Sequence, residues 1–183
     1  MNQWIFLRHG ESEANKARVF SGHQDVALTQ LGRHQALEAG SQIQNILGDS
    51  RIESVWSSDL QRARHTAQLC LSAADIDCPI QEHKALRERH LGDWQGESID
   101  RLKESGEREI LLTWTGTAPG GESLDQVCRR ALPLLSTIQP SGPTMLVAHG
   151  GLIRALLGLL DEVNKDDIGQ TNIPNAVPIV RWI

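Results

Sequence analysis

The sequence predicts an α/β fold, a three-layer sandwich in which a mainly parallel sheet carries helices on both faces and a short cap region. Short apolar runs, typical of buried strands, alternate with longer stretches in which apolar residues recur at helical spacing. The length of 183 residues and the 39% hydrophobic content fit one domain, residues 1–183, with one substantial core.

The first half of the chain contributes two predicted strands and two predicted helices. Gln3 to Leu7 is the first apolar run and predicts a buried strand. Thr29 is a suitable N-cap for a helix that ends at Gly48. A second strand is predicted at Ser54 to Ser57, and Asp59 is expected to cap the next helix. The inner faces of the two helices are formed by Ala36, Ala39, Ile43 and Leu47, and by Leu60, Ala63, Ala67 and Leu71.

The second half repeats the alternation. Ser123 and Gln126 form a possible capping box for a helix with an apolar face. Thr144 to Ala148 predicts a third strand, and Leu152 to Leu160 predicts the helix that follows it. Ala176 to Ile183 predicts a closing strand, for which Pro178 indicates an edge position. Residues 82–121 interrupt the alternation as a polar, cap-like insertion with two short helical stretches, expected to cover one end of the sheet.

Charge and composition exclude several kinds of partner. The net charge of −5 and the pI near 5.8 argue against nucleic acid or an anionic membrane as the main partner. The most apolar run, Met145 to Leu160, is interrupted by His149 and Arg154, so no membrane span is predicted, and no secretory signal is visible. The cysteines form no CxxC pair, which favours reduced thiols and a cytoplasmic protein.

Reactive and phosphate-binding residues follow three of the predicted strands. These residues are Arg8 and His9, then Ser57-Ser58-Asp59 with Arg62 one helical turn further, and finally His149-Gly150-Gly151. Ligands of parallel sheets bind beyond the carboxyl ends of the strands, so two histidines and two arginines are expected to converge there. Taken singly, a histidine at a strand end is usually structural, and an arginine on a helix usually forms a surface ion pair.

Two histidines and two arginines with little acid nearby suit an anion with several oxygens. The planar fork of arginine holds phosphate or carboxylate oxygens two at a time, although the preference for arginine over lysine in this chain has genomic bias as its alternative explanation. An imidazole can attack phosphorus and become phosphorylated. Glycines after each histidine let backbone N–H groups approach the same oxygens. No GxxxxGK[ST], GxGxxG, GxSxG or HExxH motif supports another chemistry.

These residues also carry a family resemblance. Arg8-His9-Gly10-Glu11-Ser12, followed by Asn15, resembles the opening motif of the histidine phosphatase superfamily, the phosphoglycerate-mutase-like proteins. Later segments are similar to the family's further motifs, in the order Asp25 with Leu28, Thr29 and Gly32, then Ser57 to Leu60 with Arg62, Ala63, Thr66 and Ala67, then Leu86-Arg87-Glu88 with Gly92, Trp94 and Gly96, then Pro119 to Ser123, and Ala148 to Gly151. Ala27 stands where the family commonly has proline.

The resemblance implies a role for each candidate residue. His9 would be the nucleophile that becomes phosphohistidine, and Glu88 would be the proton donor to the leaving oxygen. The phosphoryl group would be bound by Arg8, Arg62 and the second catalytic histidine, His149, with Asn15 and the backbone of Gly150 as helpers. Ser21, Gly22 and His23 would face the substrate. From the residues alone, Glu88 is as well explained as a solvated charge, and His23 as an exposed loop histidine.

The activity implied is that of a metal-independent phosphomonoesterase that needs no cofactor and acts on a small phosphorylated metabolite. A metal site built from His9, His149 and a carboxylate is disfavoured, because Arg8 and Arg62 would repel a cation. The substrate stays open among sugar phosphates, phosphoglycerate, α-ribazole phosphate and others.

Two other functions remain as alternatives. Family mutases are longer, whereas this chain stops at Ile183 and has a short cap region, so water is expected to reach the phosphoenzyme. Phosphoryl transfer of the cofactor-dependent phosphoglycerate mutase type is therefore the second hypothesis. A non-catalytic phosphate-binding protein is the third, disfavoured because both histidines, both arginines and the candidate acid are present.

Overall fold

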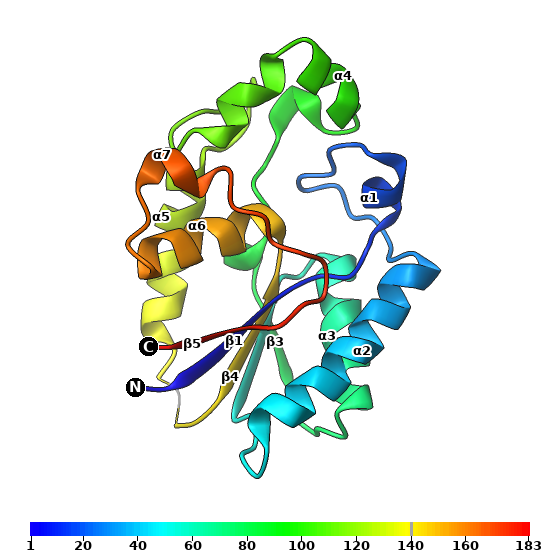
Figure 1. The fold of residues 1–183 in the computed structure, drawn as a ribbon, viewed down its shortest axis with the longest axis vertical. Helices are drawn as coiled ribbons and strands as arrows, with labels where there is room; N and C mark the ends of the chain where they lie inside the picture. Colours follow the sequence, from blue (N-terminus) through cyan, green and yellow to red (C-terminus); the bar gives the residue numbers. More distant parts are fainter. Residues whose placement is uncertain (140) are drawn as a thin grey trace.

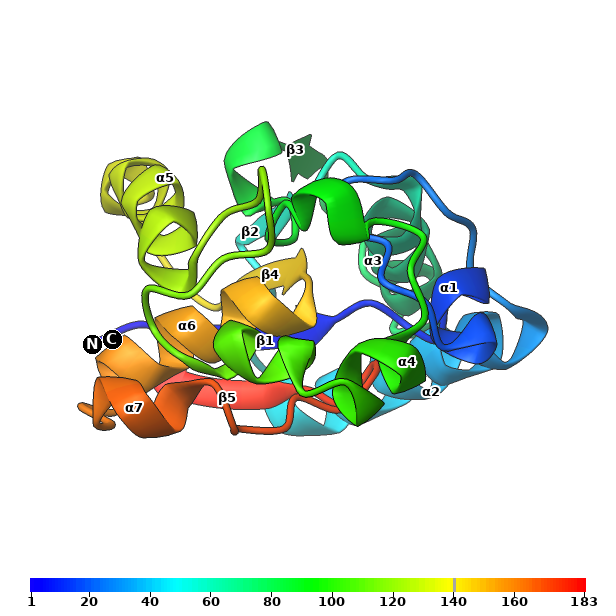
Figure 2. The same cartoon turned by 90° about the horizontal axis from the view of Figure 1, so that it is seen from above.

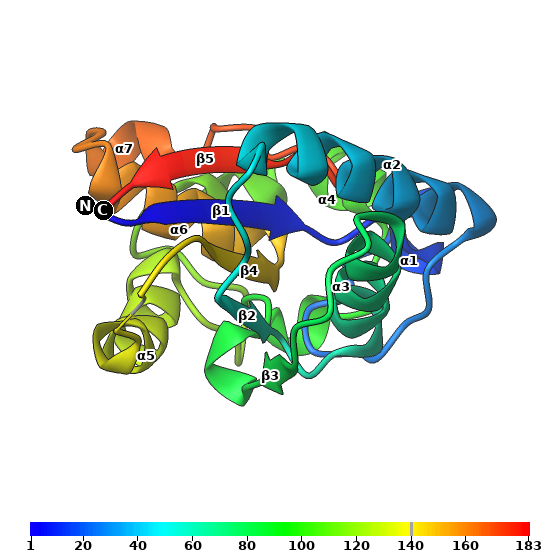
Figure 3. The same ribbon diagram turned by 90° about the horizontal axis from the view of Figure 1, so that it is seen from below.

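A mixed sheet of mostly parallel strands organises the structure. The computed structural model describes residues 1–139 and 141–183, and within this part of the chain the strands lie in the order β3-β2-β4-β1-β5 (Figure 3). Their bounds are Gln3–Arg8 for β1, Ser54–Ser57 for β2, Ile80–Glu82 for β3, Thr144–Ala148 for β4 and Ile179–Trp182 for β5. β4 pairs in parallel with both β1 and β2, so the carboxyl ends of these three strands lie at one edge. The predicted α/β fold is confirmed.

Helices cover both faces of this sheet. On one face, α2 (Gln30–Leu47) and α3 (Gln61–Ala73) pack against Ile5 and Leu7 of β1. On the other face, α5 (Leu124–Thr137), α6 (Gly150–Leu160) and α7 (Lys165–Ile168) pack against Trp4 and Phe6. Successive side chains of a strand point to opposite faces, so β1 contributes to both cores, and β4 is buried along its whole length. No helix in the described part of the chain is long and apolar enough to cross a membrane.

Two of the three predicted helix caps are present. Thr29 accepts a hydrogen bond from the N–H of Gly32, and Ser123 forms the predicted capping box with Gln126. Helix α3 begins at Gln61 without any side-chain cap, so the prediction that Asp59 caps it is wrong. The Asp59 carboxylate instead accepts two hydrogen bonds from Arg87, at 2.7 and 2.6 Å. Such a two-pronged, charge-assisted pair is stronger than a single bond to a backbone N–H.

Two other predicted boundaries shift. Helix α6 begins at Gly150, before the predicted Leu152, and β5 covers only the second half of the predicted 176–183 strand. Ala176 has a left-handed φ of 51° and Pro178 has no N–H to donate, which delays entry into the sheet until Ile179. The predicted edge position of β5 is confirmed. The sequence pattern predicts neither β3 nor α1 (Glu13–Ala17), because such short elements carry too little periodicity.

Residues 82–121 lie over the carboxyl ends of β1, β2 and β4 (Figures 1 and 2). This segment forms four short helices, not the two that the sequence predicts: η1 (Lys84–Leu86), η2 (Gly92–Trp94), α4 (Ile99–Glu104) and η3 (Glu107–Leu112). Three of them are 3₁₀ helices, whose tighter turn does not produce the 3.6-residue pattern used for prediction.

Candidate active site

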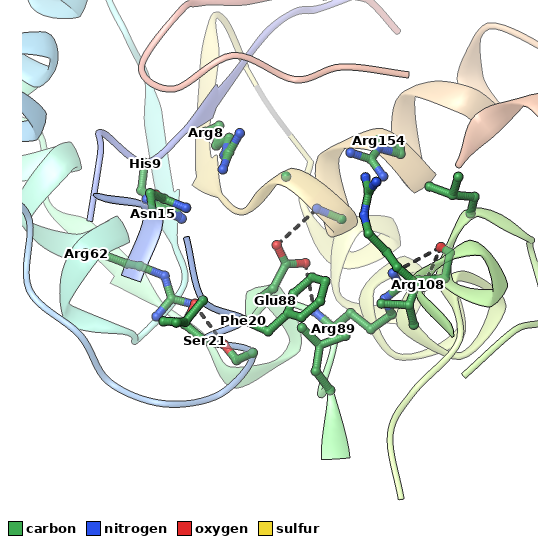
Figure 4. A pocket seen from close by; sticks show the side chains of 17 residues that line it. Arg8, His9, Asn15, Phe20, Ser21, Arg62, Glu88, Arg89, Arg108 and Arg154 are labelled. Atoms are coloured by element: carbon green, nitrogen blue, oxygen red, sulfur yellow. Dashed lines mark hydrogen bonds between the residues drawn. The ribbon is translucent and has the colours of Figure 1, made fainter. Parts of the chain in front are cut away.

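A cavity of about 180 Å³ lies between the carboxyl ends of the strands and residues 82–121 (Figure 4). Its lining includes most of the candidate residues chosen from the sequence: Arg8, His9, Asn15, Ser21, Gly22, Arg62, Glu88 and Gly150. Segments far apart in the sequence therefore converge where parallel strands end, as the strand-end argument predicts. His149 and His23 lie next to this cavity without lining it.

Backbone contacts hold His9 at the end of β1. Its N–H donates to the carbonyl of Ala148 at 3.0 Å, and its carbonyl accepts from the side chain of Asn175 at 2.8 Å. A Cβ atom on Gly10 would collide with the carbonyl of Gly32, so glycine lets this loop pack against the start of α2. The imidazole Nδ1 donates to the carbonyl of Gly10 at 2.7 Å. This tautomer leaves a lone pair on Nε2, the atom that a nucleophile needs.

His9 and His149 form a buried pair of neutral rings. Their ring centroids lie 5.1 Å apart. Burial, followed by the charge of Arg62, holds the pKa of each imidazole well below its ordinary value. The Nε2 atom of His149 lies 2.8 Å from the hydroxyl of Ser58. When that hydroxyl donates, the ring proton sits on Nδ1, which is buried and has no partner among the described residues. A buried donor without a partner is available to an anion.

Two guanidinium groups accompany His9, that of Arg62, which is buried, and that of Arg8, which is half-buried. Arg8 donates through Nη1 to the carbonyl of Ile173 at 2.7 Å, and Arg62 donates through Nη2 to the carbonyl of Gly22 at 2.8 Å. In both arginines Nε is buried and has no partner among the described residues. Burial lowers the pKa of Arg62 to about 10, so it keeps its charge at neutral pH. Each guanidinium group therefore retains one N–H donor, at Nε, that has no acceptor among the described residues.

Helix starts bring two further donors to the cavity. The Oδ1 atom of Asn15 accepts from the N–H and the hydroxyl of Ser12, at 3.1 and 3.0 Å, within the capping box of α1. The Nδ2 amide group of Asn15 is then left to donate a hydrogen bond to a ligand. Gly150 opens α6, where the first N–H groups have no acceptor within the helix and carry its positive end.

Glu88 is the only acidic side chain among the described residues that line the cavity. Its two carboxyl oxygens accept from the N–H of Arg89 at 2.8 Å and from the N–H of Gly151 at 3.1 Å. A Cβ atom on Gly151 would collide with the Glu88 carboxyl, so glycine at this position lets the carboxyl lie against the start of α6. These contacts point the carboxyl toward the strand ends (Figure 4).

A polar network behind Glu88 fixes its backbone. Arg130 of α5 donates to the carbonyls of Arg87 and Glu88, at 2.9 and 2.8 Å, and its Nε pairs with Glu122 at 2.9 Å. The Nε2 atom of His23 also lies 2.7 Å from the carbonyl of Glu88. His23 therefore supports the segment that carries Glu88, and it does not line the cavity.

Sequence reasoning missed three further arginines of the cavity wall, Arg89, Arg108 and Arg154. The sequence does mark Arg154 as a candidate for the cavity, because it is the only charged residue in the otherwise apolar helix α6. Arg89 lies in a charged run that is typical of a solvated surface, and Arg108 lies in the short helix η3, so neither stood out.

The arrangement can hold a tetrahedral anion against a neutral imidazole, with a carboxyl group on the opposite side. Arg8 and Arg62 line the cavity, and they and the adjacent His149 each keep a buried ring or guanidinium nitrogen without a partner among the described residues. In residues 1–139 and 141–183, no group of three or more His, Cys, Asp or Glu side chains is placed to hold a metal ion.

The buried histidines predict a loss of stability in mild acid. A histidine whose pKa is lower in the folded state than in the unfolded chain favours unfolding once the pH falls below about 6.5. Between pH 7.5 and 5.5, each such histidine should lower the free energy of unfolding by about 1.4 kcal/mol. Urea unfolding at both pH values measures this fall in the free energy of unfolding. In His9→Asn the fall should be smaller than in the unsubstituted protein by about 1.4 kcal/mol. Equal drops in the two proteins would contradict the buried neutral state of His9.

Comparisons with known proteins agree on one family. The sequence profile of the histidine phosphatase superfamily (branch 1) matches residues 4–180. The chain is 34% identical to a 2,3-bisphosphoglycerate-dependent phosphoglycerate mutase of Cytophaga hutchinsonii, over 95% of this chain and 84% of that protein. The structure of a mycobacterial glucosyl-3-phosphoglycerate phosphatase in complex with VO3 superposes with a TM-score of 0.86, at 29% identity, over 98% of this chain and 92% of that one. For YhfR of Bacillus stearothermophilus the TM-score is 0.84, at 26% identity, over 98% and 90% of the two chains.

Proposed function

This chain belongs to branch 1 of the histidine phosphatase superfamily, and from that premise we propose that it is a phosphomonoesterase. It hydrolyses the phosphate ester of a small metabolite through a phosphohistidine on His9, without a metal ion. The observation that carries the proposal is the His9 ring, which is neutral, has its lone pair on Nε2 and lies beside the unused donors of two arginines.

The first step transfers the phosphoryl group to His9. The Nε2 lone pair attacks phosphorus, an N–P bond forms and the bond between phosphorus and the ester oxygen breaks. Arg8, Arg62 and the Nδ1–H of His149 hold the remaining phosphoryl oxygens as negative charge redistributes. The departing oxygen takes the bond electrons and accepts a proton from the carboxyl of Glu88.

The second step releases inorganic phosphate. Water attacks phosphorus and gives a proton to the Glu88 carboxylate, so the acid of the first step becomes the base of the second. The N–P bond breaks, and its electron pair returns to Nε2 of His9. His9 is again neutral and Glu88 is again protonated, so the cycle is closed.

Phosphoryl transfer between two positions of one substrate is the competing activity. It is favoured by the 34% identity to a phosphoglycerate mutase, whereas hydrolysis is supported by the close superposition on a phosphatase. The two activities share the first step. They differ in whether water or a second hydroxyl takes the phosphoryl group from His9.

Release of phosphate from an alkyl phosphate, in the absence of any bisphosphate, separates the two activities. We expect steady release with glycerol 3-phosphate or 3-phosphoglycerate and no stimulation by 2,3-bisphosphoglycerate. If 3-phosphoglycerate is isomerised faster than it is hydrolysed, and only after priming with the bisphosphate, the protein is a mutase.

Metal independence gives a second test. The groups that hold the phosphoryl oxygens in this proposal are guanidinium, imidazole and backbone donors, so extensive chelation should leave the rate unchanged within about twofold. The measurement is the rate of phosphate release after dialysis against EDTA, with an undialysed sample as control. A large loss that one divalent ion restores would contradict the proposal.

A further inference from the structure

Three polar side chains outside the cavity lining converge on the backbone of Glu88. They are Arg130 of α5, Glu122, which lies shortly before that helix, and His23 of the loop that follows α1. The phosphoryl chemistry proposed above uses none of them. We call Arg130, Glu122 and His23 the Glu88 clamp.

The segment that carries Glu88 has little regular structure of its own. Residues 87–91 lie between the short helices η1 and η2 and belong to no helix or strand. One contact of the Glu88 carboxyl is to the N–H of Arg89 in this same segment, and the other is to the N–H of Gly151. A general acid must lie within about 2.6–3.2 Å of the oxygen that it protonates. The place of the backbone at Glu88 therefore matters for proton donation.

Arg130 holds this backbone through three carbonyl oxygens. Its Nη1 donates to the carbonyl of Ala85 at 2.7 Å, and its Nη2 donates to the carbonyls of Arg87 and Glu88, at 2.9 and 2.8 Å. The planar guanidinium group presents several N–H donors in fixed directions, which a lysine ammonium group does not. The three carbonyls are thereby fixed relative to α5.

Glu122 fixes the orientation of that guanidinium group. Its carboxylate accepts from Nε of Arg130 at 2.9 Å and from Nη2 at 3.1 Å, and it also accepts from the N–H of His90 at 2.8 Å. Burial raises the pKa of Glu122, but the hydrogen bonds from Arg130 and His90 more than offset this effect and the pKa is lowered. The pair is therefore charged at neutral pH, with both side chains half-buried.

His23 connects the backbone of Glu88 to the loop that holds Arg62. Burial lowers the pKa of the His23 ring, so the ring is neutral at neutral pH, and its Nε2–H donates to the carbonyl of Glu88 at 2.7 Å. The carbonyls of the two flanking residues, Gly22 and Gln24, each accept from Arg62 at 2.8 Å. One short loop thus holds the phosphate-binding guanidinium group and the backbone of the candidate acid.

We propose that Arg130 and His23 are positioning residues, which act through the carbonyl of Glu88 and set the place of the proton donor relative to the phosphate held by Arg62. Neither side chain lines the cavity. A purely structural role would stabilise the fold without any preference between leaving groups. The inference rests on the proposed function, in which Glu88 gives its proton to the departing oxygen.

The dependence on the leaving group tests this inference. In Arg130→Met, kcat/KM for glycerol 3-phosphate should fall about 10- to 100-fold more than kcat/KM for 4-nitrophenyl phosphate, since a displacement of about 1 Å can cost on the order of 100-fold. Arg130→Lys keeps the charge beside Glu122 without the fork, and a selective loss of at least about fivefold should remain. Arg129→Met is the matched control: Arg129 is the preceding residue of α5, is exposed, pairs with Asp125, and its loss should leave both rates unchanged.

Two further variants show whether the clamp acts through Glu88. In Glu88→Gln no proton donor is left to position, so adding Arg130→Met should change the ratio of the two kcat/KM values by less than about twofold. His23→Leu should show the same selective loss as Arg130→Met. His23→Gln, which keeps an N–H donor on its side chain, should recover most of that loss.

The outcomes separate this inference from the proposed function. Equal losses on the two esters in Arg130→Met, or a selective loss that persists in the Glu88→Gln background, would overturn the positioning role and leave the phosphatase standing. If circular dichroism shows that Arg130→Met does not fold, Arg130→Lys and His23→Leu decide by the same criterion. If Glu88→Gln alone slows both esters equally, the proton donor of the proposed function fails first, and the positioning role fails with it.

Discussion

Replacing His9 by alanine should reduce turnover by on the order of 10⁴- to 10⁶-fold, the range seen when a covalent nucleophile is removed from an enzyme. His9 provides the lone pair that attacks phosphorus, and no other imidazole lines the cavity among the described residues. His149, the nearest ring, is fully buried, with one nitrogen at the hydroxyl of Ser58. The measurement is steady-state phosphate release from an alkyl phosphate.

The His9 variant can be separated from a misfolded protein. Arg8 and Arg62 remain in His9→Ala, so binding of orthovanadate should persist and should raise the melting temperature. His34→Ala is the matched control, because His34 is exposed on α2, does not line the cavity and pairs with Glu38. A His9→Ala protein that folds, binds vanadate and still turns over at more than about a tenth of the normal rate would contradict the assignment.

Replacing Glu88 by glutamine should affect substrates according to their leaving group. An alkoxide leaves poorly without a proton, so hydrolysis of an alkyl phosphate should slow by about 10²- to 10⁴-fold. A nitrophenolate needs little help, so hydrolysis of 4-nitrophenyl phosphate should slow by less than about tenfold. Glutamine has one acceptor oxygen where glutamate has two, so one of the two contacts, with the N–H of Arg89 or of Gly151, keeps an acceptor.

Both Glu88 measurements belong on the same enzyme preparation. Glu82→Gln is the control, since Glu82 lies six residues earlier, pairs with Arg64 and does not line the cavity. Equal losses on the two substrates would mean that Glu88 has a binding or structural role. In that case Glu11, which accepts a hydrogen bond from Thr29 outside the cavity lining, would be the first carboxyl to test as the acid.

The strand-end argument succeeded because it depends on topology more than on side-chain detail. Apolar runs identify strands, and parallel strands put their carboxyl ends at one edge, so Arg8, His9 and Arg62 were expected together without any knowledge of strand order. Boundaries were harder to predict. Asp59 has the right residue type for a helix cap, and a partner distant in sequence, Arg87, takes its carboxylate.

The positions of residues in segment 82–121, and of those that pack behind the cavity, could mostly not be predicted from the sequence. His23 lies in the loop expected to face the substrate, and no local pattern predicts that its ring contacts the carbonyl of Glu88. Arg108 and Arg154 are brought together only by the packing of η3 near α6, which no local pattern predicts. A lone charge in an apolar helix, such as Arg154, is the local signal that deserves weight in such sequences.

The central claim is the phosphohistidine on His9, and trapping it is the most direct test. The enzyme is mixed with a substrate labelled in its phosphoryl group, quenched in alkali within milliseconds and digested, and the labelled peptide is identified by mass spectrometry. The account predicts a phosphoryl group on His9 that forms and decays at least as fast as turnover, and that is absent in His9→Ala. Normal turnover without a phosphoenzyme, or with the phosphoryl group on His149, would contradict it.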